Sequence, residues 1–132
     1  KLEPQLNVFL ESLELRGIAI SRQYLEQGKP EESLQVLEDM LYLEGSRCIT
    51  LHYQMGLQLL QLKQWQKAIG HLANCRKGDP KFYDPVFHLG EIARRTGNTA
   101  EATKYFQYCR KHPPEKTPNA SQVMEEFLKR EK

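Results

Sequence analysis

A pattern of turn, helix start and small residue occurs three times along the chain, and it restricts the possible folds more than any other feature. The small residues are Ser33, Ala68 and Ala102, so successive copies lie 35 and 34 residues apart. A unit of this length is a supersecondary element that buries its apolar face only by stacking on a neighbouring unit. The repeat therefore predicts an all-α stack of helix pairs.

Further positions keep the same register in every copy. Before each turn a large apolar residue precedes a small one, in Ile20-Ser21, Met55-Gly56 and Leu89-Gly90. After each turn, apolar residues follow the small residue by four and seven positions, at Leu37, Met40, Leu72, Cys75, Phe106 and Cys109. These spacings place the side chains on one helix face. A glycine inside a helix costs about 1 kcal/mol relative to alanine, so Gly56 and Gly90 predict close helix packing.

This register resembles the tetratricopeptide repeat, a helix–turn–helix unit of about 34 residues. The second and third copies also end at prolines, Pro80 and Pro114, as the family pattern does. The first copy departs from it, with Ser21 and Gly45 in place of Gly and Pro. The resemblance covers about residues 14–116 and implies a right-handed superhelical stack of three repeats.

The expected layout is a single domain over 1–132. The repeats span about 14–47, 48–81 and 82–115, and a capping helix follows at about 118–130. The predicted helices are 5–27, 30–44, 48–62, 65–78, 85–96, 99–111 and 118–130. The first is long and carries Leu6, Phe9 and Leu10 ahead of the first repeat, which predicts an apolar contact surface. The chain begins at Lys1 without Met, which suggests a fragment of a longer protein.

Charge and composition narrow the classes of partner. The 19 basic and 17 acidic residues give the 132-residue chain a formal net charge of +2. That value does not indicate nucleic-acid binding, and no apolar run has the length of a membrane helix. Three widely spaced cysteines, Cys48, Cys75 and Cys109, form no disulfide framework. We therefore expect free thiols in a reducing compartment and a cytoplasmic protein.

Metal binding and catalysis are the chemical alternatives. His71 and Cys75 lie four residues apart, and Cys109 and His112 lie three apart, so facing helices could form a zinc site. Core packing is the favoured interpretation, because both cysteines occupy apolar core positions of the repeat. No nucleophile elbow, phosphate loop or paired-acid motif occurs. We therefore expect no metal, no cofactor, no catalytic residue and no enzyme activity.

The resemblance implies a site on the concave face, where the first helix of each pair binds a partner peptide or helix. By register, that face holds Leu15, Ile18, Ala19, Arg22, Thr50, Tyr53, Gln54, Leu57, Phe87, His88 and Glu91. This mixture suits a partly apolar segment of another protein. The alternative is that some of them, Tyr53 and Phe87 above all, pack between repeats instead.

Chaperone-binding members of the family clamp a C-terminal carboxylate with Lys, Asn, Asn, Lys and Arg. The corresponding positions here are Ile18, Arg22, Gln54, Asp84 and His88. The basic clamp is missing and Asp84 should repel a carboxylate, so we expect no binding of acidic chaperone tails.

Two functions from different classes remain at this point. The leading one is a protein-interaction module or scaffold that holds a partner segment in the concave groove. The alternative is a structural unit that self-associates through its N-terminal helix, or forms part of a larger repeat array. RNA binding, as in pentatricopeptide repeats, would need a basic groove that a nearly neutral chain does not predict.

Overall fold

Seven helices make up the part of the chain that the computed structural model describes, residues 4–44 and 49–130, with side chains for 13–42 and 49–130. They are α1 (Pro4–Glu26), α2 (Pro30–Glu44), α3 (Ile49–Gln61), α4 (Trp65–Gly78), α5 (Asp84–Arg95), α6 (Thr99–Lys111) and α7 (Ala120–Arg130). No strand occurs within the described residues. The predicted all-α class is confirmed. Leu6, Phe9, Leu10 and Cys48 lie outside the residues whose side chains are described.

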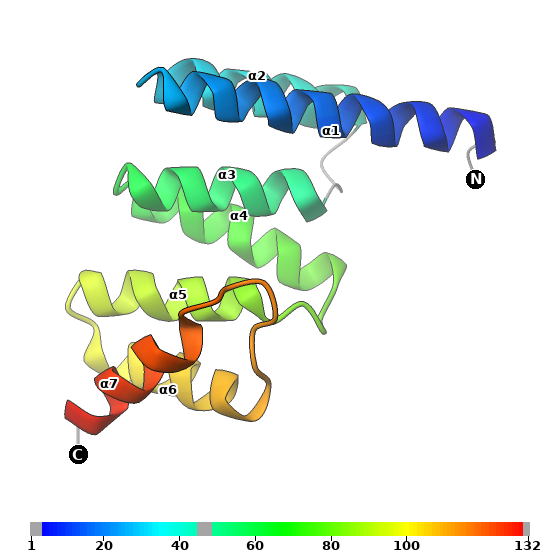
Figure 1. The fold of residues 1–132 in the computed structure, drawn as a ribbon. Helices are drawn as coiled ribbons and strands as arrows, with labels where there is room; N and C mark the ends of the chain where they lie inside the picture. The colour runs from blue at the N-terminus through cyan, green and yellow to red at the C-terminus, as the bar shows by residue number, and fades with distance from the viewer. Residues whose placement is uncertain (1–3, 45–48, 131–132) are drawn as a thin grey trace.

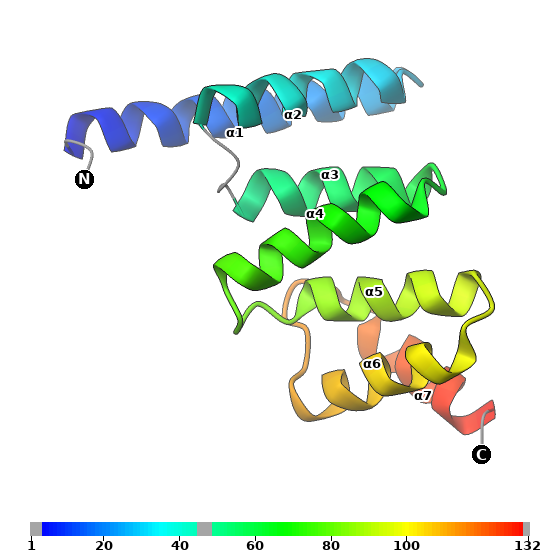
Figure 2. The same ribbon diagram turned by 180° about the vertical axis from the view of Figure 1, so that it is seen from behind.

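The helices form three antiparallel pairs, α1 with α2, α3 with α4 and α5 with α6, stacked one on the next (Figure 1). The first helices α1 and α3 face the viewer in Figure 1, and their partners α2 and α4 face the viewer in Figure 2. The short helix α7 packs against the last pair. This arrangement gives the stack one face formed by first helices and one formed by second helices.

Glycines mark the places where paired helices approach most closely. A Cβ atom added to Gly56 would lie 2.8 Å from Leu72, and one added to Gly90 would lie 2.6 Å from Phe106. Each glycine therefore packs on the apolar residue that follows the next small residue by four positions, as the register predicts. In the first pair the equivalent position is Ser21, and the close approach lies one turn earlier, where a Cβ atom added to Gly17 would lie 2.8 Å from Met40.

The three turns share one backbone conformation. Gly28, Lys63 and Gly97 have φ values of 75°, 61° and 82°, in the left-handed region. They lie 35 and 34 residues apart, like the small residues of the repeat. Glycine adopts this conformation without strain, whereas Lys63 carries a side chain there at some cost. The turns thus repeat with the same register as the packing.

The connection between α6 and α7, residues 112–119, is called the strap below. It crosses the face of α5 in Figure 1 instead of turning directly into α7. The sequence predicted that the last helix would begin at about residue 118, but α7 begins at Ala120. The backbone carbonyl of Thr117 accepts a hydrogen bond from the Ala120 N–H at 3.1 Å. This bond closes a turn around Pro118 and Asn119 and delays the helix by two residues.

Candidate partner-binding groove

A groove opens on the side of the first helices, between α1, α3, the α4–α5 connection and the strap. Its volume is about 630 Å³. The lining residues are Arg22, Ile49, Thr50, Tyr53, Gln54, Asp79, Lys81, Phe82, Glu115 and Lys116. A site of this size falls within the range of about 300–1,000 Å³ in which proteins hold ligand groups. The groove is therefore large enough for several side chains of a partner.

Two aromatic rings form the apolar floor of the groove. The rings of Tyr53 and Phe82 pack edge to face with 4.8 Å between their centroids. The Tyr53 hydroxyl lies 3.1 Å from Nε2 of His88. Burial raises the pKa of Tyr53 to about 12, and burial lowers the pKa of His88. Both groups are therefore neutral at pH 7, and the phenol can donate to the imidazole nitrogen.

Charges of both signs surround this floor. Arg22, Lys81 and Lys116 line it with positive charge, and Asp79 and Glu115 with negative charge. A groove with an apolar floor and a mixed rim resembles the apolar centre and polar edge of a protein interface. It lacks the one-sided basic charge of a nucleic-acid groove.

The structure sorts the predicted groove residues into three groups. Arg22, Thr50, Tyr53 and Gln54 come together in the groove. Leu15 and Ala19 are exposed on α1 outside the residues that line it, and Leu15 is 68% exposed. The third group, Ile18, Leu57, Phe87, His88 and Glu91, does not line the groove.

The residues of the third group make contacts within the chain. Ile18 and Phe87 are buried in the core between helices, and Leu57 packs partly against it. His88 lies behind Tyr53. Glu91 has its carboxylate 3.1 Å from Arg94, within its own helix. Phe87 packs within the last helix pair and against α7, with its ring 5.7 Å from that of Phe106 between centroids.

Asp84 also differs from its predicted role. It was expected to present a negative charge to a ligand, but it is only 2% exposed. Its Oδ2 accepts hydrogen bonds from the Lys116 N–H at 2.9 Å and from the Thr117 hydroxyl at 2.6 Å. The carboxylate therefore holds the strap and does not act on a bound segment.

Half of the residues that line the groove lie outside the first helices and were not predicted from the sequence, because the predicted site included only the first helix of each pair. Asp79, Lys81 and Phe82 come from the α4–α5 connection, and Glu115 and Lys116 come from the strap. Connections carry no helical period that would assign their side chains to a face. The signals that were available are Phe82, two residues before Asp84, and the three prolines of 113–118.

Comparisons with known proteins show which fold this is. No protein-family model matches the sequence, and no curated protein matches it. A similar solved structure is the Yersinia enterocolitica type III secretion chaperone SycD in complex with a peptide of the translocator YopD. It has a TM-score of 0.75 and 18% identity, over 92% of this chain and 96% of that one.

Two other solved structures extend the comparison. The first TPR of Spaghetti (RPAP3), bound to the HSP90 peptide SRMEEVD, has a TM-score of 0.72 and 14% identity, over 87% and 90% of the two chains. MamA MSR-1 C2 has a TM-score of 0.59 and 20% identity over 69% of this chain. This chain spans about half, 52%, of that MamA chain. This chain has the tetratricopeptide-repeat fold.

Within this tetratricopeptide-repeat fold, the four candidate zinc ligands lie in different surroundings. Cys75 and Cys109 are buried in separate apolar clusters, and burial raises the pKa of each thiol to about 12. Nδ1 of His71 lies 2.9 Å from Nδ1 of His52, and His112 stacks on the ring of Tyr83. Among the described residues, no group of three or more potential metal ligands occurs.

No helix within 4–44 and 49–130 combines the length and the apolar character needed to cross a bilayer.

Proposed function

We propose that this chain is a protein-interaction module that holds a segment of a partner protein in the groove above Tyr53 and Phe82. The observation that carries the proposal is the open groove on the face of the first helices, with its aromatic floor and exposed polar rim. In this proposal the chain is a scaffold without catalytic residues or cofactor, in the cytoplasm, where Cys75 and Cys109 stay free thiols.

Structures with the same fold support this assignment. SycD was solved with a peptide of YopD, and PcrH with the chaperone-binding region of PopD. The RPAP3 repeat was solved with an HSP90 peptide. At 14–18% identity these relatives support the mode of binding and not the identity of the partner.

Changing the charge pattern of the groove is expected to remove the partner without unfolding the chain. In the double variant Arg22→Glu/Thr50→Arg, both changed side chains are exposed in the groove. We expect affinity to fall at least about 30-fold, because hot-spot changes cost about 2 kcal/mol or more. The measurement is affinity capture from lysate with quantitative mass spectrometry, followed by calorimetry with the captured partner.

The matched control is Lys67→Glu, which reverses a charge at an exposed position of α4 that does not line the groove. It should retain the partner. If both variants lose the same partners, or neither does, the groove is not the site. If the chain captures only further copies of itself and sedimentation shows a concentration-dependent dimer, the self-associating unit replaces this proposal. Exposed Leu15 and Ile20 on α1 are the surface for that outcome.

An acidic chaperone tail is not the proposed ligand. At the clamp positions Ile18 and Asp84 are buried, Gln54 is neutral and His88 has a lowered pKa, so only Arg22 offers a fixed positive charge. We expect the labelled peptide SRMEEVD to show no saturable change in fluorescence anisotropy. A scrambled peptide should behave identically. Saturable binding with a micromolar Kd, about −8 kcal/mol, would contradict this expectation.

A further inference from the structure

The strap is longer than the fold needs for connecting two helices. The corresponding connection between α4 and α5 spans only residues 79–83, whereas the strap spans 112–119 and includes Pro113, Pro114 and Pro118. Proline fixes φ and removes a backbone donor, so this segment is stiff and forms few ladder hydrogen bonds. It therefore depends on side chains of other elements for its position.

Asp84 supplies the main attachment of the strap. One carboxylate oxygen accepts both the Lys116 N–H and the Thr117 hydroxyl, at 2.9 and 2.6 Å. A buried carboxylate is stable only when hydrogen-bonded or paired, so the carboxylate and the strap stabilise each other. Thr117 also lies close enough to Tyr53 for its hydroxyl to lower the pKa that burial raises. The attachment thus reaches the floor of the groove.

Equivalent positions in the three repeats show what the strap changes. Leu15, Thr50 and Asp84 occupy the same register position in α1, α3 and α5. The first two are exposed, and the third is buried with the strap hydrogen-bonded to it. The surface that the first two helices offer to solvent is therefore covered in the third.

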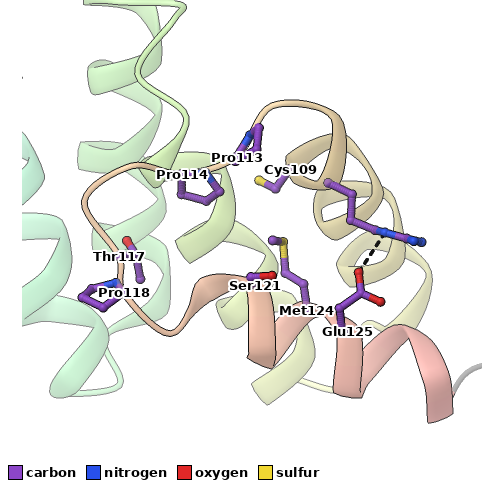
Figure 3. A pocket seen from close by; sticks show the side chains of 9 residues that line it. Cys109, Pro113, Pro114, Thr117, Pro118, Ser121, Met124 and Glu125 are labelled. Atoms are coloured by element: carbon purple, nitrogen blue, oxygen red, sulfur yellow. Dashed lines mark ion pairs between the residues drawn. The ribbon is translucent and has the colours of Figure 1, made fainter.

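The outer and inner sides of the strap have separate contacts. On the outer side, Glu115 and Lys116 line the groove, and the Lys116 ammonium lies 5.3 Å from the centre of the Phe82 ring. On the inner side, a hollow of about 220 Å³ separates the strap from α6 and α7 (Figure 3). The residues that line this hollow include Pro113, Pro114 and Cys109. The side chain of Cys109 is fully buried. The thiol of Cys109 can therefore report on the position of the strap.

We propose that Asp84 is a positioning residue for the groove: it holds the strap against α5, so that the strap forms one wall and ends the groove at the third repeat. The ligand then lies between α1, α3 and the strap, and a partner that extends along α5 has to displace the strap. The role of Asp84 in binding rests on the proposed function, but the attachment of the strap to Asp84 can be tested without a ligand.

The test uses variants that change the attachment of the strap with little change of side-chain shape. Thr117→Val deletes the hydroxyl, Asp84→Asn removes the charge, and Thr117→Ser retains the hydroxyl as a conservative control. The probe is iodoacetamide, with each alkylated cysteine identified by mass spectrometry. Alkylation of a buried thiol proceeds through local opening. We expect the Cys109 rate to rise about tenfold in Thr117→Val, which loses a bond to a charged group, and in Asp84→Asn, where the acceptor is neutral. In Thr117→Ser the rate should stay at the original value.

Cys75 is the internal control, because it is equally buried but belongs to another cluster, formed mainly by residues of α3 and α4. Its rate should stay unchanged while that of Cys109 rises. Hydrogen exchange at the Lys116 amide should accelerate together with the Cys109 alkylation. Unchanged Cys109 alkylation in both variants overturns the proposal, and so does an equal rise at both cysteines, which would mean general loosening.

The two proposals fail in different ways. Selective exposure of Cys109 without any partner in the groove leaves the strap attachment standing and contradicts the proposed function. A groove partner whose affinity is the same for Thr117→Val and for the original chain contradicts the role of the strap as a wall.

Discussion

Replacing Phe106 with alanine is expected to lower the free energy of unfolding by about 3–5 kcal/mol. The Phe106 side chain is 0% exposed. Its ring lies 5.7 Å from that of Phe87 in α5 and 5.2 Å from that of Phe127 in α7, between centroids. The substitution therefore empties the centre of a cluster to which α5, α6 and α7 all contribute buried residues. Because domains of this kind are stable by about 5–15 kcal/mol in total, the last repeat and α7 should unfold first.

Urea unfolding followed by circular dichroism measures this loss. Tyr108→Ala is the matched control. It truncates an aromatic side chain two positions further along α6, and that side chain is 38% exposed. We expect it to cost no more than about 1 kcal/mol, as is usual for changes outside the core. Equal losses for the two variants would show that the last repeat has no packed centre at Phe106.

The helix layout could be predicted to within two residues at every end because several independent signals repeat in one register. The turns at Gly28 and Gly97, the small residues and the apolar positions that follow them all recur with the same spacing. Each signal alone is weak, but a periodic pattern leaves only one arrangement in which every copy buries the same face. Close packing at Gly56 and Gly90 follows from the same register.

The register was less informative about which side of a first helix meets a ligand. Ile18, Tyr53 and Phe87 occupy the same position in the three repeats, and all are at most 9% exposed. That position lies between helices, and of the three residues only Tyr53 also lines the groove. A shift of one position along a helix rotates the side chain by about 100°. Periodicity alone therefore does not separate an interior column of residues from the ligand-facing column beside it.

The role of Asp84 could not be read from the sequence for a different reason. Its partners, Lys116 and Thr117, lie 32 and 33 residues away in a segment without helical period. Without the position of the strap, the pair Asp84-Pro85 indicates only the start of a helix. Two of the ten residues that line the groove, Glu115 and Lys116, belong to the segment that the hydrogen bonds to Asp84 hold, so the candidate site was predicted less completely than the fold.

Replacing Gly90 in α5 or Gly70 in α4 with alanine should change the free energy of unfolding in opposite directions. Gly90 faces Phe106 so closely that an added Cβ would lie 2.6 and 2.8 Å from two ring atoms and 3.1 Å from Cβ of Tyr105. Phe106 is held by Phe87 and Phe127 and has little room to move. Overpacking costs about 1–3 kcal/mol, against a gain in helix propensity of about 1 kcal/mol. Gly90→Ala is therefore expected to destabilise the chain by up to about 2 kcal/mol.

Gly70 is the matched case, because it lies inside α4 and an added Cβ would meet no atom within 4 Å. Gly70→Ala should stabilise the chain by about 0.5–1 kcal/mol, since only the helix propensity changes. The two variants differ by the same methyl group, so the sign of each effect depends on what the methyl group meets. Urea midpoints measured under identical conditions give both values. A stabilising shift for both would mean that Phe106 moves to make room, and that the glycine of the third repeat is not needed for close packing.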